Sequence, residues 1–459
     1  MDDATAKLLR ETAQRAIDYL SGLDARHVGA TRDAGAIADR LRHLPESGEA
    51  PAAVVAALAD AVEDGLVASA GPRYFGFVIG GAVPVSVAAD WLTAAWDQNS
   101  ALHALSPAAA AAEQVAGEWM LDLLGLPADW SFGLPTGAGL GNAVGLAAGR
   151  HAILANAGWD VETKGLYGAP EIEVIVGAEA HATALSALQY LGLGRDRVNR
   201  IPVDDQGAMR ADAFAAALAG AADRPVLVSA QAGNVNTGAF DPLPAIADAC
   251  ATHTNVWLHV DGAFGAWAAV SPRLQHLVED MDRADSVSTD AHKWLNVGYD
   301  CGFIGVRDQA AHRAAMTVSA AYLMPGSGKR DGWEYVLDSS RRSRGFALYA
   351  TIRSLGRSGV RELVERCCDL AVQLAQRLAA VDGIEVLNEV VLNQVLVRFG
   401  GDDARTNEVI RRVQEDGTAW MGGTVWQGKA AMRISVSNWS TTPADIDQTA
   451  DAIIRAFSG

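Results

Sequence analysis

A regular alternation of helical and short apolar segments between residues 110 and 306 restricts the fold more than any other feature. The expected helices are 109–124, 141–157 and 182–191. The expected strands are 173–176, 200–202, 225–230, 256–260, 286–289 and 302–306. Because each strand is separated from the next by a segment long enough for a crossover, the pattern predicts an α/β domain. Its central sheet is expected to be mostly parallel and covered by helices on both faces.

The chain changes character on either side of this region. Residues 1–75 are mainly helical in pattern, with apolar side chains at helical spacing. After residue 346 a long helical stretch precedes short strands and further helices, which is typical of a smaller α+β domain. In a chain of 459 residues we therefore expect an N-terminal helical segment, 1–75, a large domain, 76–345, and a C-terminal small domain, 346–459.

Charge and cysteine content exclude several classes of function. The 55 acidic and 37 basic residues give a formal net charge of −18, so phosphate backbones and anionic lipids are repelled. We therefore expect no nucleic acid and no membrane as partner. The four cysteines have no metal-ligand spacing, and no metal site is expected. The first residues carry acids and lack an apolar leader, which favours a cytoplasmic protein.

Lys293 is the first candidate for chemistry. It follows the expected strand 286–289 and lies between His292 and Trp294. A lysine beside apolar and aromatic residues at a strand end can lose its proton on desolvation, and a neutral amine forms a Schiff base with an aldehyde. Taken alone, Lys293 is equally explained as a solvated surface charge, as most lysines are.

Asp261 supplies a second group. It follows the apolar strand 256–260, and the small residues after it allow a flat ring to approach the backbone. An enzyme that uses pyridoxal 5′-phosphate (PLP) needs a carboxylate opposite the ring nitrogen, since that pair keeps the ring protonated as an electron sink. On neighbouring strand ends, Asp261 could pair with the ring nitrogen while Lys293 binds the aldehyde of the same cofactor. Asp261 alone could also be a helix N-cap.

A glycine-rich loop, 133–142, lies before the expected helix 141–157. Its small residues leave backbone N–H groups free to bind a phosphate at the start of the helix, where the dipole favours negative charge. The loop is not the GxGxxG of dinucleotide-binding folds, because Asn142 stands at the third-glycine position, and no good apolar strand is expected before it. Alone the loop could be a flexible turn, but beside Lys293 and Asp261 it predicts a phosphate site.

His181 follows the expected strand 173–176. An imidazole in this position can stack over a cofactor ring and can donate or accept a proton. A histidine that caps the following helix is the alternative.

Together these motifs resemble those of the group II PLP-dependent amino acid decarboxylases, a family of fold type I. The family includes aromatic amino acid, tyrosine, glutamate and diaminobutyrate decarboxylases. The resemblance covers nearly the whole chain and is most specific at His292-Lys293-Trp294 and at the run His-Val-Asp-Gly-Ala, 259–263. It implies PLP as cofactor, an amino acid as substrate, and a carboxy-lyase of amino acid metabolism that releases CO₂ and forms the corresponding amine.

The resemblance also implies roles for matching residues. Lys293 resembles the Schiff-base lysine, Asp261 the partner of the ring nitrogen, and His181 the stacking histidine. The cofactor-binding residues that it implies are Gly137, Ala138, His181, Asn234, Asp261, Ala263, Asp290, His292 and Lys293. The position of Asp290 is often asparagine in the family, and a carboxylate near a phosphate needs a compensating donor.

A tyrosine on a loop is the implied proton donor of the family. Tyr335 fills that role most readily in this chain, and Tyr322 is the alternative. Without such a donor the outcome would be that of an aldehyde synthase, which couples decarboxylation to oxidative deamination. The polar residues Asn99 and His103 depart from the aromatic-specific relatives, so the amino acid substrate is not implied.

Other functions remain open at this stage. An aminotransferase or a Cβ-lyase on the same fold would use the same lysine and aspartate and would differ in its product. A catalytically silent binding protein is a further alternative, although the presence of all four candidate groups argues against it.

The resemblance implies a homodimer as well. Active sites of this family are completed across a dimer interface, and the N-terminal helical segment lacks a lobe of its own to pack on. We therefore expect residues 1–75 to pack on the partner subunit in a two-fold dimer.

Overall fold

The computed structural model describes residues 1–318 and 329–459 and divides them into two compact units. The large unit comprises Ala82–Asp369 and Asn388–Gln394, and the small unit comprises Met1–Gly81, Leu370–Leu387 and Val395–Gly459. The three-part division predicted from the sequence stays a prediction.

A seven-stranded sheet forms the centre of the large unit, in the order β1-β7-β6-β5-β4-β2-β3. Its strands are β1 (Ser131–Gly133), β2 (Glu173–Gly177), β3 (Val198–Ile201), β4 (Val226–Gln231), β5 (Val256–Asp261), β6 (Ser286–Asp290) and β7 (Gly302–Val306). The pairs from β3 to β6 are parallel, whereas β7 is antiparallel to both β6 and β1. The predicted α/β fold with a mostly parallel sheet is therefore confirmed.

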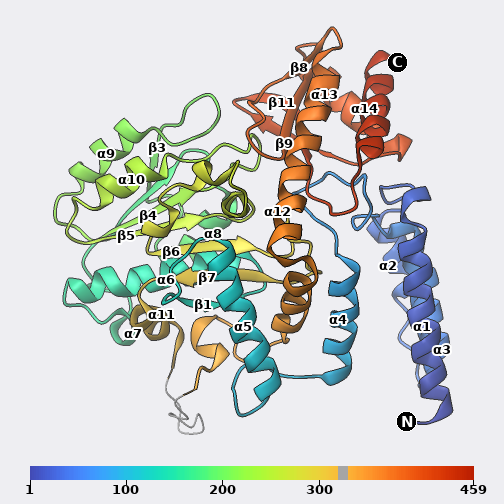
Figure 1. The fold of residues 1–459 in the computed structure, drawn as a ribbon, viewed down its shortest axis with the longest axis horizontal. Coiled ribbons are helices and arrows are strands. Elements are labelled where there is room, and N and C mark those ends of the chain that lie inside the picture. The colour runs from blue at the N-terminus through green and yellow to red at the C-terminus, as the bar shows by residue number, and fades with distance from the viewer. Residues whose placement is uncertain (319–328) are drawn as a thin grey trace. The chain divides into compact units, whose positions relative to one another are not determined.

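Helices cover the sheet of the large unit (Figure 1). They are α4 (Pro84–Trp96), α5 (Pro107–Leu123), α6 (Ala138–Asn156), α7 (Val161–Lys164), α8 (Ala182–Tyr190), α9 (Ala211–Gly220), α10 (Leu243–Cys250), α11 (Gln309–Met316) and the first part of α12 (Arg344–Ala379). Helices α8 and α11 contact α6, which lies on β4 to β7. Right-handed crossovers require α9 and α10 on the opposite face, because the chain moves outward from β2 to β3 and then returns to β4.

The structure differs from the sequence expectations on either side of the glycine loop. A strand, β1, does precede this loop, and its three residues, Ser131–Gly133, are buried and pair with β7. Helix α6 begins at Ala138 rather than at Gly141, so Gly137 is its N-cap residue. The loop therefore connects a strand directly to a helix N-terminus.

The small unit contains a four-stranded sheet in the order β10-β11-β9-β8. Its strands are β8 (Ile384–Val386), β9 (Gln394–Phe399), β10 (Gly422–Trp426) and β11 (Lys429–Ser435). Its helices are α1 (Asp3–Ser21), α2 (Ala34–Leu41), α3 (Pro51–Val62), the end of α12, α13 (Asp403–Asp416) and α14 (Pro443–Ser458). The predicted smaller α+β element is thus present, with β10 as a strand that the sequence pattern did not indicate.

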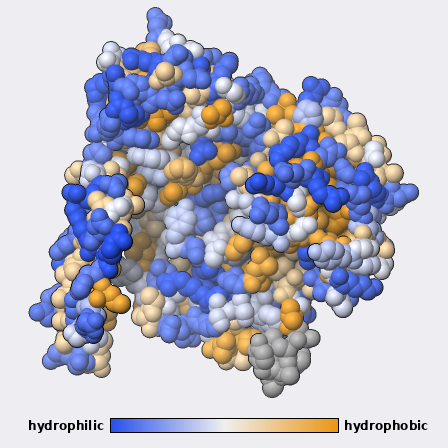
Figure 2. Space-filling model, turned by 180° about the vertical axis from the view of Figure 1, so that it is seen from behind, coloured by the Kyte–Doolittle hydropathy of each residue, from blue (hydrophilic) through white to orange (hydrophobic). Residues whose placement is uncertain are grey.

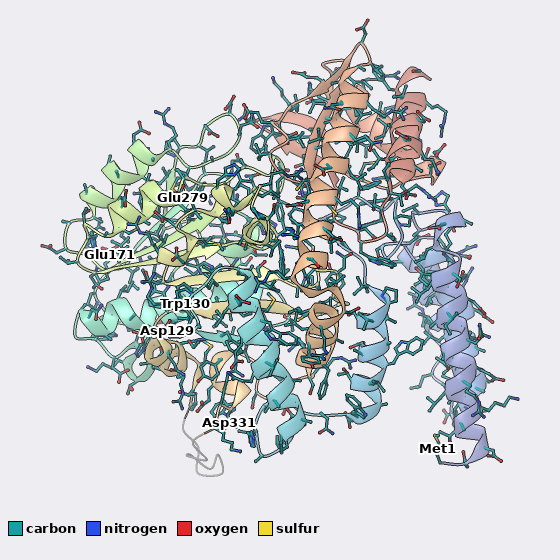
Figure 3. All side chains as sticks on the ribbon, viewed as in Figure 1. Met1, Asp129, Trp130, Glu171, Glu279 and Asp331 are labelled. Carbon is teal, nitrogen blue, oxygen red and sulfur yellow. The ribbon has the colours of Figure 1, made fainter. Side chains whose placement is uncertain are left out.

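Buried contacts tie the N-terminal residues of the small unit to its C-terminal ones. The Arg73 guanidinium donates to Asp445 (2.9 Å) and to the carbonyl of Thr418 (2.8 Å). Next to it, the ring of Tyr74 stacks on Trp420 with 5.1 Å between centroids. By contrast α1, which starts beside Met1 in Figure 3, contains no buried residue.

Hydrophilic side chains cover much of the face seen in Figure 2, as the net charge of −18 requires, and hydrophobic ones form separate patches. Among the helices that the structure describes, none combines the length and the apolar character that crossing a bilayer demands.

A buried ion cluster joins α5 to the segment before α12 in the large unit. Both carboxylate oxygens of Glu113 accept from Arg341 (2.7 and 2.5 Å), and Arg330 donates to Oε1 (3.0 Å). Burial opposes ionisation of Glu113, but the two guanidinium groups hold the pKa of this carboxyl below its ordinary value. A charge cluster in such a place is stable only while every member keeps its partner.

We predict that Glu113→Gln lowers the free energy of unfolding by about 3–5 kcal/mol, because it leaves two buried guanidinium groups uncompensated. Asp90→Asn is the matched control, since the Asp90–Arg342 pair (2.7 Å) is exposed and should contribute less than about 1 kcal/mol. Urea unfolding of both variants measures the difference. Equal small losses would contradict this view of the cluster.

Candidate functional site

The carboxyl ends of β4, β5 and β6 lie side by side at one edge of the large-unit sheet. In the parallel register Gln231 is opposite Asp261, and Asp261 is opposite Ser288. Side chains just beyond these positions therefore gather at the same edge, which is where ligands bind in sheets of this type.

Asp261 is the last residue of β5, and its carboxylate is held at both oxygens. Oδ1 accepts the N–H of Ala263 (3.2 Å), and Oδ2 accepts the side-chain amide of Asn142 (2.8 Å) from α6. Asp261 is buried, whereas the methyl-bearing Ala263 beside it is partly exposed. The strand end thus presents a fixed negative charge beside a small side chain.

Lys293 and Asp290 form an ion pair after β6. The Lys293 Nζ lies 2.9 Å from Oδ2 of Asp290, and 19% of the lysine side chain is exposed. His292 Nε2 is 3.5 Å from Oδ1 of the same carboxylate, and its Nδ1 accepts the N–H of Cys301 (3.1 Å). Burial lowers the pKa of His292, which favours the neutral imidazole.

The N-terminus of α6 faces the same carboxylate. The N–H of Ala138 donates to Oδ1 of Asp290 at 2.5 Å. A Cβ on Gly302 would come within 2.6 Å of the backbone of Gly137, and a Cβ on Gly137 would come within 3.0 Å of the ring of His292. Glycine is thus required where α6 begins, and the first N–H groups of the helix form a ready anion site.

His181 is the N-cap residue of α8. Its Nδ1 accepts from the N–H of Thr183 (3.3 Å) and lies 2.7 Å from the hydroxyl of the same residue, while its own N–H donates to Gln231 (3.1 Å). The methyl of Thr183 would be 3.4 Å from a Cβ on Gly139, so the N-termini of α8 and α6 are neighbours. The capping role, which the sequence left open as an alternative, is present, and the cap lies beside the N-terminus of α6, while the stacking role stays a prediction.

Asn234, Tyr335 and Tyr322 are three further residues that were predicted for the site. The side-chain oxygen of Asn234 accepts N–H groups of Asn236 (2.8 Å) and Thr237 (3.3 Å) and so stabilises a turn. Tyr335 is buried; its hydroxyl accepts from Gln309 of α11 (3.2 Å). Tyr322 lies outside the residues that the structure describes.

Two residues that support Asp261 were not predicted from the sequence. Asn142 was noted only as a departure from a glycine pattern, and His259 only as part of a motif. In the structure both are fully buried, and His259 Nε2 lies 3.0 Å from Oδ1 of Asn142. A single polar residue in the apolar and glycine-rich stretch 138–149 is the signal that could have found Asn142.

The set of groups at this edge fits PLP. An amine for the aldehyde (Lys293), a carboxylate for the ring nitrogen (Asp261) and a helix N-terminus for the phosphate (α6) all belong to the large unit. A metal site would need a cluster of three or more His, Cys, Asp or Glu side chains. No such candidate cluster occurs among residues 1–318 and 329–459.

Comparison with known proteins agrees with this fit. Residues 39–399 match the family described as "Pyridoxal-dependent decarboxylase conserved domain". Tryptophan decarboxylase 1 of Oryza sativa subsp. japonica is 28% identical over 92% of this chain and 87% of its own length. Acidic amino acid decarboxylase GADL1 of Homo sapiens is 29% identical over 75% of this chain and 67% of its own length.

Solved structures show the same fold. Oryza sativa TDC with PLP and tryptamine superposes with a TM-score of 0.92 at 23% identity, covering 100% of this chain and 98% of that one. Mouse CSAD superposes with a TM-score of 0.90 at 22% identity, covering 99% and 98%.

Fold and site together define a PLP-dependent enzyme of fold type I. The match over most of the chain is more specific: the chain belongs to the pyridoxal-dependent decarboxylase family. It is a PLP-dependent amino acid decarboxylase, a carboxy-lyase that releases CO₂ and forms the corresponding amine.

The buried His259 makes stability depend on pH. Burial lowers its pKa to about 4, from about 6.5 in an unfolded chain. Between these values the unfolded chain binds a proton that the folded protein does not, so the free energy of unfolding should fall as the pH drops from about 6.5 to about 4. The fall due to His259 should be roughly 3 kcal/mol.

We predict that His259→Gln, which keeps a donor and an acceptor but cannot titrate, makes stability less dependent on pH in that window. Urea unfolding at a series of pH values measures this. His276→Gln, at an exposed site, is the control and should retain the wild-type dependence. A His259→Gln profile as steep as that of the wild type would show that His259 is not held neutral.

Proposed function

We propose that this decarboxylase acts on its amino acid at the sheet edge formed by β4, β5 and β6. Lys293 is the amine that binds the cofactor aldehyde, and Asp261 is the carboxylate that faces the ring nitrogen. The observation that carries the proposal is the placement of Asp261 and the Lys293–Asp290 pair on adjacent parallel strand ends, with the first turns of α6 bonded to both carboxylates.

When bound, PLP supplies an electron sink for the pair of electrons left as the bond from Cα to the carboxylate breaks. Asp261 stabilises a positive charge on the ring nitrogen, and the low dielectric of its buried position strengthens that interaction. Ala263 offers a small, partly exposed side chain against which a flat ring can pack.

Asp290 has two functions in this proposal. Its Oδ2, 2.9 Å from Lys293 Nζ, can take the proton that the amine must lose before it attacks an aldehyde. That transfer also neutralises the carboxylate, which would otherwise repel a phosphate at the N-terminus of α6. Gly137, Ala138 and His292 complete the phosphate surroundings, because each lies against Asp290 or the start of α6.

His181 is the proposed donor of the proton that Cα receives after CO₂ leaves. Because Nδ1 accepts the N–H of Thr183, the neutral imidazole carries its proton on Nε2. Tyr335 and Tyr322 stay predictions for the same role. The Tyr335 hydroxyl also accepts a hydrogen bond from Gln309, which ties Tyr335 to helix α11. Asn234 stays a predicted neighbour of the ring, and its side chain stabilises the turn that follows it.

A homodimer is the proposed assembly. Helices α1 and α3 have no buried residue, yet both expose apolar side chains, at Leu9 and Ile17 on α1 and at Val54 and Leu58 on α3. Apolar faces of this kind indicate a protein partner. A second copy of the chain is the occupant we propose, with the N-terminal segment packed on the partner subunit.

The large unit has an apolar surface that could receive those helices. A groove between α4, α5 and α12 is lined by Ala89, Trp96, Ala111, Ala112, Val115, Phe346, Tyr349 and Ala350. Trp91 and Leu92 are also exposed, and they lie on the same helix, α4, as two residues that line the groove. In a two-fold dimer each copy can cover the groove of the other, which explains why both surfaces are apolar.

We predict that Leu58→Asp on α3 converts the dimer to a monomer, because it places a charge in an apolar interface. Mass measurement in solution, by light scattering during gel filtration, tests this. Val425→Asp, at an exposed strand position, is the control and should remain dimeric. A wild-type monomer with full turnover would contradict the dimer.

The cytoplasm is the proposed compartment. All four cysteines, Cys250, Cys301, Cys367 and Cys368, are buried free thiols, which suits a reducing environment.

The activity is tested with a panel of aromatic, acidic and basic L-amino acids, monitored for CO₂ and for the organic product. We expect CO₂ and an amine in equal amounts with at least one class. Hydrogen peroxide with an aldehyde would indicate an aldehyde synthase, an oxo acid an aminotransferase, and an eliminated group a Cβ-lyase.

We predict that Lys293→Ala abolishes both turnover and the absorption band near about 420 nm that a PLP Schiff base gives. Lys164→Ala, at an exposed position on α7, should leave both unchanged. A Lys293→Ala protein that keeps the band and full turnover would contradict the proposed site.

A further inference from the structure

We propose that Asn142 is a positioning residue that fixes the Asp261 carboxylate and, as the last member of a buried chain of donors, presents it as an acceptor to the cofactor ring. The inference rests on the proposed function of Asp261 and extends it to a residue on α6 that contacts this carboxylate. Asn142 is fully buried, and its Nδ2 lies 2.8 Å from Oδ2 of Asp261.

The chain of donors begins at Trp257 on β5. The indole Nε1 can only donate, and it donates to the hydroxyl of Ser286 (3.0 Å). Ser286 Oγ in turn lies 2.9 Å from His259 Nδ1, and His259 Nε2 lies 3.0 Å from Oδ1 of Asn142. All of these side chains are buried.

The direction of the chain follows from its two ends. Trp257 must donate, so the Ser286 hydroxyl is free to donate to His259 Nδ1, and the imidazole then carries its proton on Nε2. That proton points at the Oδ1 of Asn142, which therefore accepts and leaves the amide N–H for Asp261. An ionised carboxylate can only accept, so every bond of the chain has the same sense.

Ser288 makes the orientation of the Asn142 amide more definite. Its hydroxyl donates to the same Oδ1 at 2.5 Å, so two donors converge on that oxygen. A flipped amide would turn its oxygen toward the carboxylate of Asp261, where two acceptors would repel each other. The low pKa of His259 agrees with this arrangement, because the chain requires a neutral imidazole.

Close packing makes the chain possible. A Cβ on Gly145 would be 2.7 Å from His259 Nδ1, and a Cβ on Gly141 would be 3.1 Å from Ser288. Both glycines flank Asn142 on α6, and they let the helix approach β5 and β6 closely enough for a short side chain to reach Asp261. The consequence is a carboxylate that is held in one orientation at both of its oxygens.

The test compares two ligands: PLP and its carbocyclic analogue, in which C–H replaces the ring nitrogen. Dissociation constants are measured on the cofactor-free chain by quenching of tryptophan fluorescence. For Asn142→Leu we expect about a tenfold or greater loss of affinity for PLP, as for a lost hydrogen bond to a charged group, and a loss of less than about threefold for the analogue. The two ligands differ only at the ring nitrogen. A loss of affinity for PLP alone therefore reports on Asp261, the proposed partner of that nitrogen.

Two further variants complete the design. Asn142→Asp tests the sense of the bond, since it replaces the donor by an acceptor and should weaken PLP binding at least as much. Asn255→Ala, which removes a side-chain bond to the Ile153 carbonyl at the other end of α6, should change neither constant. Thermal unfolding of each cofactor-free variant shows whether it is folded.

The outcomes are distinct. Equal losses for both ligands, or no loss in folded Asn142→Leu, would overturn the positioning role. Retention of tight PLP binding by Asn142→Asp would overturn the direction of the chain. If the wild type itself binds no PLP, the proposed function fails, which is a separate result.

Discussion

The burial of two carboxylates at adjacent strand ends is the constraint on which the rest of the site depends. Asp261 and Asp290 are both buried, and an ionised carboxylate in such a position is stable only with several donors around it. The chain meets this need differently for each. Asp261 receives neutral N–H groups, from Asn142 and Ala263, whereas Asp290 receives a backbone N–H and a lysine cation.

This difference in partners separates the roles of the two acids. Neutral donors leave the charge of Asp261 uncompensated, so it is available to a cation in a ligand. The charge of Asp290 is already balanced by Lys293, and in the proposed reaction Asp290 takes up the proton that makes the amine neutral. Two residues of the same type therefore have different chemistry because of what surrounds them.

Helix α6 satisfies both carboxylates, and its glycines determine how closely it does so. Its first N–H reaches Asp290, and Asn142, one turn later, reaches Asp261. Neither contact could form if side chains separated the helix from β5, β6 and β7. The approach at Gly302, where a Cβ would be 2.6 Å from Gly137, shows how little space remains.

The sequence predicted those parts of the fold that have a strong local pattern. Most strands from β2 to β7 are short apolar or β-branched runs, and the ends of β5 and β6 bring Asp261 and Lys293 together once a parallel sheet is assumed. Strand β1 was missed because its three residues, Ser131–Gly133, gain their strand conformation by pairing with β7, which is distant in sequence. Asn142 was missed for the same reason, since its role exists only after α6 meets β5.

In the proposed reaction the protonation of Cα depends on a tautomer of His181 that a helix cap determines. The hydroxyl of Tyr335 accepts from Gln309, and its ring packs edge-on against His312, so this residue is part of the packing around α11. His181 is held by the start of α8, where the N–H of Thr183 needs an acceptor. That need assigns the lone pair of the imidazole to Nδ1 and its proton to Nε2. The same bond that begins the helix thus orients the proposed proton donor, and in the proposed reaction the amine-forming outcome is linked to the first turn of α8.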